Sequence, residues 1–354
     1  MKILWLSPHG DGWSLAAKLR EAGHRTIYFC PDPGNQNGDG LLPRANGNAS
    51  WKDYAAKSDL VVVDGNFPSR RTRRSLEASD FSYALRTLSG PQVQGPVPTT
   101  ELLESDTRYL RKILHRAGLG ARAKPATDKP EGPAGVRFVP EALKITASWG
   151  PADGLDWVFR HRHLLGGDVG LPGNGPELGN LGDVVLPASP AQPLAQATYP
   201  LVRFLRGLGY QGYVNLDLAV EGPEQFQVER VFCRFLYPAV FIQFGALLGL
   251  YPPQPGVAVS LLRFSPEAAS DSDHLRDSPG FFGAEVHTDD SGRLQAHGEF
   301  VGACVGTDED WTMARERVNR QLTSSLRPGW GFRPNVGDSV AAALQRLTEW
   351  GWIS

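Results

Sequence analysis

The alternation of apolar and polar positions predicts a strand–helix–strand unit at the start of the chain. Residues 2–7 form an apolar run, and residues 15–23 carry leucines and alanines at helical spacing before a terminating glycine. Residues 25–30 and 58–65 are further apolar runs, and the second is typical of a parallel strand that is buried on both faces. This order predicts a doubly wound α/β domain over residues 1–98.

The turn between the first strand and the first helix contains Gly10 and Gly12. In doubly wound folds this turn lies where ligands bind. A tight strand-to-helix turn also favours glycine for conformational reasons alone. The sequence therefore leaves two interpretations open, a ligand contact and a plain turn.

The middle of the chain begins with a strong helical pattern. Residues 99–119 place acidic side chains early and basic ones late, and Thr99 or Thr100 is a candidate N-cap. Residues 121–135 are rich in proline and glycine, which predicts a linker or a mobile loop. We expect a central domain over residues 99–275.

A glycine-rich loop over residues 166–183 is the most informative local feature of this central region. Its backbone N–H groups are suited to surround an anion, and Asp168 and Asp183 are candidates to hold a metal or an amine. The alternative is a long surface connection, although long loops without a function are uncommon.

A run of alternating arginine and histidine precedes this loop at residues 160–163. It forms a candidate phosphate site, or His161 and His163 lie on one face of a strand as metal ligands. The sequence offers no third ligand nearby, which disfavours the metal. A solvated strand face explains the run as well as phosphate binding does.

A predicted hairpin carries the main candidate for a metal site. Residues 213–220 and 226–235 form its two strands, with Asp217 on the first and Glu229 on the second. Carboxylates on paired strands are one way to hold Mg²⁺ beside nucleotide phosphates. The competing interpretation is that Asn215 and Asp217 face solvent, in alternation with inward leucines.

The pattern predicts three further elements around this hairpin. A helix over residues 193–212 ends in glycine, residues 283–306 form a second hairpin with Asp-Ser-Gly at its turn, and residues 308–326 form a capped amphipathic helix. We therefore expect a β-rich C-terminal domain over residues 276–354.

Composition and charge narrow the classes of partner. The chain of 354 residues has a net charge of −2 and a pI near 6.5, which gives no general attraction to nucleic acid or to anionic membranes. The arginine cluster at residues 69–77 is interpreted as a solvated helix start, because no aromatic residues are interleaved with it. We expect a small-molecule substrate and no nucleic-acid partner.

Cysteine usage and the apolar runs indicate a cytoplasmic protein. Cys30, Cys233 and Cys304 lie far apart without a Cys-x-x-Cys pair, which disfavours a disulfide framework and a thiolate zinc site. The first residues predict a strand rather than a secretory signal, and no apolar stretch is long enough to span a membrane.

The order of these elements resembles that of the glycinamide ribonucleotide synthetase (phosphoribosylamine–glycine ligase) family. The members of this family are ATP-grasp ligases of purine synthesis. The N-terminal matches are SPHGDGWSLAAKL, in which Gly10 takes a family glycine position, PDPGN and DLVVVDG. The later matches are LLESDTRYLRKILHRAGL, RHRHL, GGDVG, GNLG, FCRF, GEFVGACVG and GFRPNVGD. These pieces follow the family's order over the whole chain.

The resemblance implies an α/β architecture with an N-terminal doubly wound parallel-sheet domain, a reduced ATP-grasp body and a C-terminal β-rich α+β domain. It implies ATP and Mg²⁺ as cofactors, and an acyl phosphate formed on the way to joining a carboxylate and an amine. The substrate would be an amino acid or a phosphoribosyl amine. Asp217 and Glu229 would hold the metal, and Asp217 and Arg234 would be catalytic. The implied cofactor-binding residues are Gly10, Gly12, His161, Arg162, Asp168, Gly179 and Gly182.

The chain also departs from the family's pattern. Between Gly118 and Arg160 it is too short for the small subdomain that carries a Gly-Lys-Gly flap over the ATP phosphates. Phe232 and Arg230 stand where the family has its metal-binding asparagine and glutamate. Glu229 takes the glutamate's role only if a β-bulge shifts the register.

Two functions from different classes therefore remain open. The first is a divergent ATP-dependent carboxylate–amine ligase, for which a protein partner would supply the elements that the chain lacks. The second is a catalytically inactive relative that keeps the fold to bind a phosphorylated small ligand or a protein partner.

Overall fold

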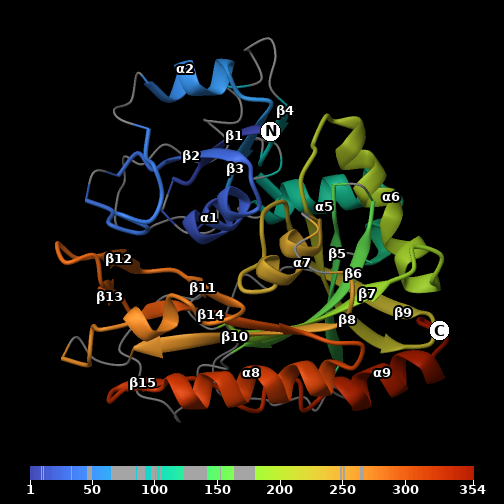
Figure 1. Cartoon of the computed structure of the whole chain (residues 1–354). Coiled ribbons are helices and arrows are strands. Elements are labelled where there is room, and N and C mark those ends of the chain that lie inside the picture. Colours follow the sequence, from blue (N-terminus) through green and yellow to red (C-terminus); the bar gives the residue numbers. More distant parts are fainter. Residues whose placement is uncertain are drawn as a thin grey trace, which may run out of the picture. The chain divides into compact units, whose positions relative to one another are not determined.

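The fold is given by a computed structural model of the chain (Figure 1). It describes residues 1–8, 10, 12–32, 34–45, 50–64, 85, 92–96, 100, 102–103, 106–122, 142–151, 153–162, 180–247, 249, 252–263 and 267–354. At residues 50, 161–162, 180–181 and 247 it describes the backbone alone. The arginine cluster and most of the predicted linker and glycine-rich loop lie outside the described residues.

The chain divides into two compact units whose segments interleave along the sequence. Unit 1 comprises Met1–Val97, Arg160–Leu186 and Arg234–Gly337. Unit 2 comprises Pro98–Phe159, Pro187–Cys233 and Asp338–Ser354. The sequence-based division into three consecutive domains stays a prediction.

Unit 1 begins with a parallel sheet, as the apolar runs predict. Its described strands are β1 (Lys2–Leu6), β2 (Arg25–Phe29), β3 (Leu60–Val63) and β4 (Gln92–Gln94). They lie side by side in the order β2-β1-β3-β4, with parallel pairing. Helix α1 (Trp13–Glu21) connects β1 to β2, and α2 (Ser50–Ala56) precedes β3. Apolar side chains of β1, β2, β3, β4 and α2 pack in one buried cluster, so the doubly wound prediction is confirmed.

The rest of unit 1 is built on antiparallel strands. They are β7 (Asn180–Ala188, whose last two residues belong to unit 2), β10 (Gly256–Arg263), β11 (Phe281–Gly283), β14 (Phe300–Thr307) and β15 (Trp330–Gly331). The order is β11-β14-β10-β7, and β15 pairs with β10. The helical elements are α7 (Val240–Leu247), the 3₁₀ turn η2 (Asp273–Leu275) and α8 (Trp311–Ser325).

Two sequence predictions in this part of unit 1 are confirmed. Strands β12 (Val286–Thr288) and β13 (Leu294–Ala296) form an antiparallel hairpin with Asp-Ser-Gly within its turn. Helix α8 is capped by Asp310, whose carboxylate accepts a hydrogen bond from the Thr312 N–H at 2.8 Å. The helix packs closely on β14, since a Cβ on Gly306 would lie 2.8 Å from the Ala314 carbonyl oxygen.

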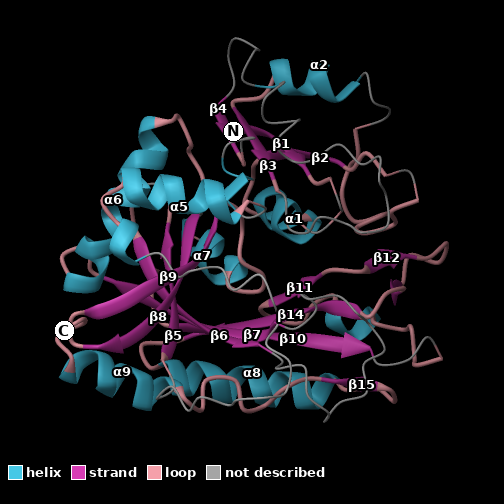
Figure 2. Cartoon of the chain, turned by 180° about the vertical axis from the view of Figure 1, so that it is seen from behind, coloured by secondary structure: helices cyan, strands magenta, loops and turns pink. Residues whose placement is uncertain are grey.

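Unit 2 contains a second antiparallel group of strands with helices around it (Figure 2). Its strands are β5 (Leu143–Trp149), β6 (Leu155–Arg162, whose last three residues belong to unit 1), β8 (Val214–Gly222) and β9 (Gln225–Phe232), in the order β6-β5-β8-β9. Its helical elements are α5 (Thr107–Arg116), the 3₁₀ turn η1 (Gly120–Arg122), α6 (Pro193–Gly207) and α9 (Val340–Glu349).

The predicted hairpin and the helix predicted over residues 193–212 are confirmed in unit 2, whereas the helix predicted over residues 99–119 is interrupted at Asp106, and α5 begins at Thr107. Strands β8 and β9 pair as expected, and α6 is followed by Gly209 at a φ of +83°. Helix α5 is capped by Asp106 rather than by Thr99 or Thr100. Asp106 is extended, and its carboxylate accepts hydrogen bonds from two first-turn N–H groups at 2.8 and 3.0 Å. In the part of the chain that the structure describes, no helix is both long and apolar enough to cross a membrane.

Candidate functional site

The turn after β1 is closed tightly around two glycines. Gly10 has a φ of +83°, which favours glycine, and a Cβ there would lie 2.4 Å from the Asn35 amide nitrogen. A Cβ on Gly12 would lie 1.9 Å from a carboxylate oxygen of Asp64 and 2.4 Å from the indole nitrogen of Trp5. Packing therefore explains both glycines, and their role as cofactor-binding residues stays a prediction.

A buried carboxylate lies next to this turn, at the carboxyl end of β3. Asp64 is 1% exposed and accepts a hydrogen bond from Trp5 Nε1 at 2.5 Å. The chain runs from β1 first to β2 and then to β3 on the opposite side of β1. Such switch points bind ligands in doubly wound sheets. The negative charge of Asp64 favours a ligand that donates hydrogen bonds or carries positive charge at this point.

Arg234, the candidate catalytic arginine, is half-buried in unit 1, two positions after the last residue of β9. The following residue, Phe235, stacks on Trp5 with the ring centroids 5.9 Å apart. Phe244 of α7 meets both rings edge-on at 5.4 and 5.6 Å. This aromatic cluster joins the segment that begins at Arg234 to the turn that contains Gly12.

Burial keeps the phenol and the thiol near this turn protonated. The pKa of Tyr28 is raised well above its ordinary value by burial and then by the nearby Cys30 and Asp64. Burial also raises the pKa of the Cys30 thiol to about 12. Neither group ionises at neutral pH, so neither provides a nucleophile beside Asp64.

In unit 2, strands β5 and β8 share a face of polar side chains. Thr146 Oγ1 donates a hydrogen bond to Asp217 Oδ1, and Ser148 Oγ donates one to Asn215 Oδ1, each at 2.6 Å. Both pairs lie directly opposite each other in the strand register. Asn215 is fully buried and Asp217 is 7% exposed. The interpretation that these two residues face solvent is therefore wrong, although the predicted alternation of faces is correct.

A β-bulge lies where the sequence comparison required one. Asp217 pairs with Arg230 and Leu218 pairs with Val228, which leaves Glu229 as the extra residue of β9. The Glu229 carboxylate forms an ion pair with Lys144 Nζ of β5. Lys144 and Thr146 share a face of their strand, so Glu229 reaches the polar face that holds Asp217.

The pair Asp217 and Glu229 nevertheless does not fit a Mg²⁺ ion. Glu229 is neutralised by Lys144, and Arg230 is the register partner of Asp217. Cationic side chains beside the two carboxylates repel a divalent cation. Among the described residues, no group of three or more His, Cys, Asp or Glu side chains is arranged to hold a metal.

The side chain of Asp183 binds a backbone N–H group and does not line the predicted loop. It is fully buried in β7, accepts a hydrogen bond from the Ala239 N–H at 2.9 Å and lies 3.8 Å from Arg160 Nε. Because β7 begins at Asn180, the predicted glycine-rich loop ends before residue 180, and Gly182 also lies inside the strand.

Replacing Gly182 with alanine is expected to destabilise unit 1 by about 1–3 kcal/mol, the usual cost of overpacking a core. The added Cβ would lie 2.6 Å from Val336 Cγ2 and 2.9 Å from the Ala258 carbonyl oxygen of β10. Chemical denaturation measures the change, and Gly207→Ala, at a position with nothing within 4 Å of the added Cβ, is the matched control.

The other predicted site residues cannot be placed by their side chains. His161 and Arg162 end strand β6, where only the backbone is described. His163, Asp168 and Gly179 lie outside the described residues.

Sequence reasoning missed the partners that hold the polar face. Lys144, Thr146 and Ser148 alternate with buried apolar residues along β5. This period of two was readable in the sequence as a strand with one polar face. No pattern in the sequence predicts the hydrogen bond between Trp5 and Asp64, because the two residues are 59 positions apart.

No protein-family model matches the chain, and no curated protein matches it in sequence. Its fold is similar to that of phosphoribosylamine–glycine ligase from Thermotoga maritima, with a TM-score of 0.61, 17% identity and coverage of 95% of this chain and 100% of that one. N5-carboxyaminoimidazole ribonucleotide synthetase from Thermus thermophilus matches with a TM-score of 0.55, 15% identity and coverage of 92% and 98%. A biotin carboxylase from Campylobacter jejuni matches with a TM-score of 0.56, 12% identity and coverage of 98% and 96%.

The chain has an ATP-grasp fold. The expected fold class is thereby confirmed, including the N-terminal parallel sheet and the large antiparallel group of strands. Three different kinds of ATP-grasp enzyme match at comparable TM-scores, so the likeness identifies the fold and not one family within it.

Proposed function

We propose that the chain is a divergent ATP-grasp enzyme that joins a carboxylate to an amine through an acyl phosphate. The observation that carries the proposal is the similarity of fold, over nearly the whole chain, to a phosphoribosylamine–glycine ligase. The motifs of that family follow in order along the sequence, which supports a phosphoribosyl amine or an amino acid as the substrate and a role near purine synthesis.

In this proposal Asp217 is the catalytic carboxylate of unit 2. It is buried, and the Thr146 hydroxyl fixes one of its oxygens at 2.6 Å. A charge in such a site interacts more strongly with a bound substrate than an exposed charge does. Arg234 is the matching cationic candidate in unit 1, suited to contact a phosphoryl group.

ATP, when bound, supplies the phosphoryl group that activates the carboxylate. The described residues offer no fitted Mg²⁺ site at Asp217 and Glu229, so we assign no step to a metal held by that pair. The predicted phosphate contacts at His161, Arg162, Asp168 and Gly179 remain part of the proposal.

Calorimetry with Mg-ATP, followed by an ADP-release assay, tests the proposed function. We expect saturable ATP binding at millimolar nucleotide or below, and ADP release that depends on an added amine and carboxylate. Glycine with phosphoribosylamine is the first substrate pair, and a pool of amino acids is the second. A chain that binds no ATP at millimolar concentration contradicts the proposal.

A second candidate is an inactive relative that binds a phosphorylated ligand or a protein partner. The ion pair between Lys144 and Glu229 favours it, as does Arg230 opposite Asp217, because both place positive charge where a metal ligand is expected. ATP binding without amine-dependent ADP release would be the signature of this candidate.

Replacing Lys144 with methionine is expected to raise the affinity of the chain for Mg²⁺ in the presence of ATP several-fold. The change removes a cation that holds Glu229, and it costs less than about 1 kcal/mol of stability because the lysine is 56% exposed. Lys112→Met, on the exposed face of α5, removes the same charge from the same unit and is expected to change nothing. Equal Mg²⁺ affinities of both variants would show that Lys144 is not what keeps a metal ion from Glu229.

A further inference from the structure

The hairpin of β12 and β13 in unit 1 places two histidine rings on one face. His287 lies in the middle of β12 and pairs with Gln295, while His297 lies two residues beyond Gln295, directly after β13. Residues two apart along a strand share a face, so both rings lie on the same side of the hairpin. Their Nδ1 atoms are 3.2 Å apart.

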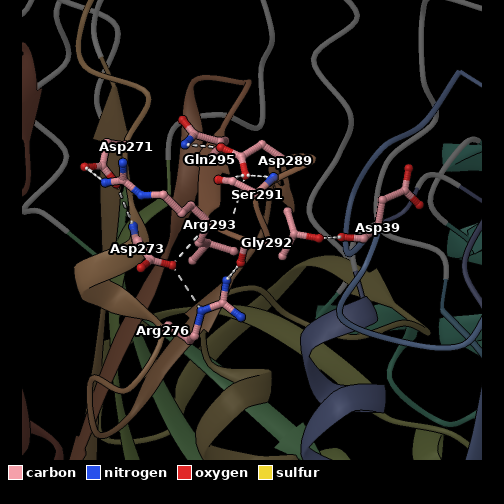
Figure 3. Close-up of polar contacts among 11 residues, drawn as sticks. Asp39, Asp271, Asp273, Arg276, Asp289, Ser291, Gly292, Arg293 and Gln295 are labelled. Carbon is pink, nitrogen blue, oxygen red and sulfur yellow. Dashed lines mark hydrogen bonds and ion pairs between the residues drawn. The ribbon is translucent and has the colours of Figure 1, made fainter.

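Polar contacts within and beside the hairpin hold this register (Figure 3). The Asp289 carboxylate accepts hydrogen bonds from Ser291 and from the Gln295 side chain across the turn. Arg293 pairs with Asp271 at 2.9 Å on the neighbouring segment. On the open side of β12, the Asp39 carbonyl oxygen accepts hydrogen bonds from Thr288. The histidines are therefore positioned by a supported strand pair rather than by a loose loop.

A chain of hydrogen bonds orients the second histidine. Asn37, which is 6% exposed, donates from Nδ2 to the Gly10 carbonyl oxygen at 3.1 Å. That contact directs its Oδ1 to His297 Nε2 at 2.9 Å. An oxygen only accepts, so His297 Nε2 carries the hydrogen and Nδ1 of the neutral ring keeps its lone pair. In the metal-free hairpin this lone pair accepts the hydrogen bond from His287 Nδ1, and a metal takes the place of that hydrogen when His287 carries its N–H at Nε2 instead.

The arrangement has the features of a ligand pair for a transition metal. Two imidazole nitrogens bound to one tetrahedral Zn²⁺ at about 2.0–2.1 Å lie about 3.3 Å from each other, close to the separation observed here. Metal-binding histidines usually donate their second N–H to a carbonyl or carboxylate oxygen, as His297 does to Asn37.

We propose that His287 and His297 form a bidentate site for a borderline divalent transition metal such as Zn²⁺, Ni²⁺ or Cu²⁺. Imidazole nitrogen selects these ions over Mg²⁺ and Ca²⁺, which prefer oxygen. Both rings are accessible, because His287 is half-buried and His297 is exposed. The remaining coordination positions are taken by water or by an incoming ligand.

A metal at this site would also fix the backbone after β1. The hydrogen bonds run without interruption from His297 through Asn37 to the carbonyl oxygen of Gly10. Binding at the hairpin would thus make the turn that contains Gly10 more rigid. The proposed metal site does not depend on the ligase function, because neither His287 nor His297 is assigned to the reaction.

The test is calorimetric titration of the chelator-treated, tag-free full-length chain with Zn²⁺ alone, supported by Cu²⁺ electron paramagnetic resonance. We expect the resonance spectrum to show two nitrogen ligands. His287→Ala and His297→Ala should each weaken Zn²⁺ binding at least tenfold and lose one nitrogen from the spectrum. His115→Ala, on the exposed face of α5 in unit 2, removes a histidine elsewhere and should leave the affinity unchanged.

Asn37→Ala separates positioning from ligation. Asn37 touches no metal in the proposal, so its loss should weaken Zn²⁺ binding several-fold while both nitrogens remain in the Cu²⁺ spectrum. Thermal melts without metal establish that each variant is folded, and His287→Gln and His297→Gln replace any alanine variant that is not. Wild-type Zn²⁺ affinity in both histidine variants, or the absence of any Zn²⁺ binding at millimolar concentration, would overturn the proposal.

Discussion

Replacing Trp5 with alanine is expected to lower the free energy of unfolding of unit 1 by about 3–5 kcal/mol, the usual cost of truncating a buried aromatic residue to alanine. Trp5 is fully buried in β1 and stacks on Phe235 with the rings tilted by 27°. Its indole N–H also donates the hydrogen bond that Asp64 accepts. Urea denaturation followed by circular dichroism measures the change.

Trp5→Phe divides this effect into its two parts. Phenylalanine keeps most of the aromatic packing but removes the donor, so the buried Asp64 carboxylate loses its indole partner. We expect a loss of about 1–3 kcal/mol from this change, the usual cost of such a group. If Trp5→Phe were as stable as the wild-type chain, the hydrogen bond would contribute nothing and Asp64 would not depend on Trp5.

The sequence predicted the strands of the parallel sheet well because their apolar runs are unambiguous. Residues 58–65 contain β3 (Leu60–Val63), which is buried on both sides as its composition indicates. The sequence did not predict helix α7 (Val240–Leu247), because its pattern of apolar residues is ambiguous. Its residues are apolar apart from Gln243, so neither a period of two nor one of 3.6 can be read from them.

Glycine has two uses that a sequence alone does not distinguish. Gly182 was assigned to a loop that binds anions, yet it lies in β7 against Val336. Its missing side chain makes room for a neighbour, as at Gly12 beside Asp64. The choice between a flexible loop and a close approach depends on residues that are distant in sequence.

The hairpin of β8 and β9 shows what strand patterns establish and what they do not. Alternation correctly separated Asn215 and Asp217 from Leu216 and Leu218, and the bulge at Glu229 lies where the family comparison placed it. The burial of Asn215 could not be read from alternation, because the pattern says which side chains share a face and not what covers that face. Lys144, the ion-pair partner of Glu229, lies on another strand 85 positions away.

Asp217→Asn is expected to reduce amine-dependent ADP release roughly 10²–10³-fold, the range seen when one charge-stabilising group is removed from an active site. The substitution keeps the shape of the side chain and an oxygen to accept the Thr146 hydrogen bond, so the fold should be retained. Only the negative charge on the buried polar face is lost. Steady-state ADP release at saturating substrates measures the effect, and a thermal melt establishes that the variant is folded.

Glu221→Gln is the matched control, because Glu221 lies four positions along the same strand and is exposed. It removes the same charge from an exposed position of β8, away from the buried Asp217, and it should release ADP at the wild-type rate. A loss of activity in Asp217→Asn alone would place the reaction at the polar face of unit 2 even though Glu229 is held by Lys144. Full activity in Asp217→Asn would contradict the catalytic assignment and leave the ATP-grasp fold to act through other residues. Equal loss in both variants would show that the charge of β8 as a whole, and not the position of Asp217, controls the rate.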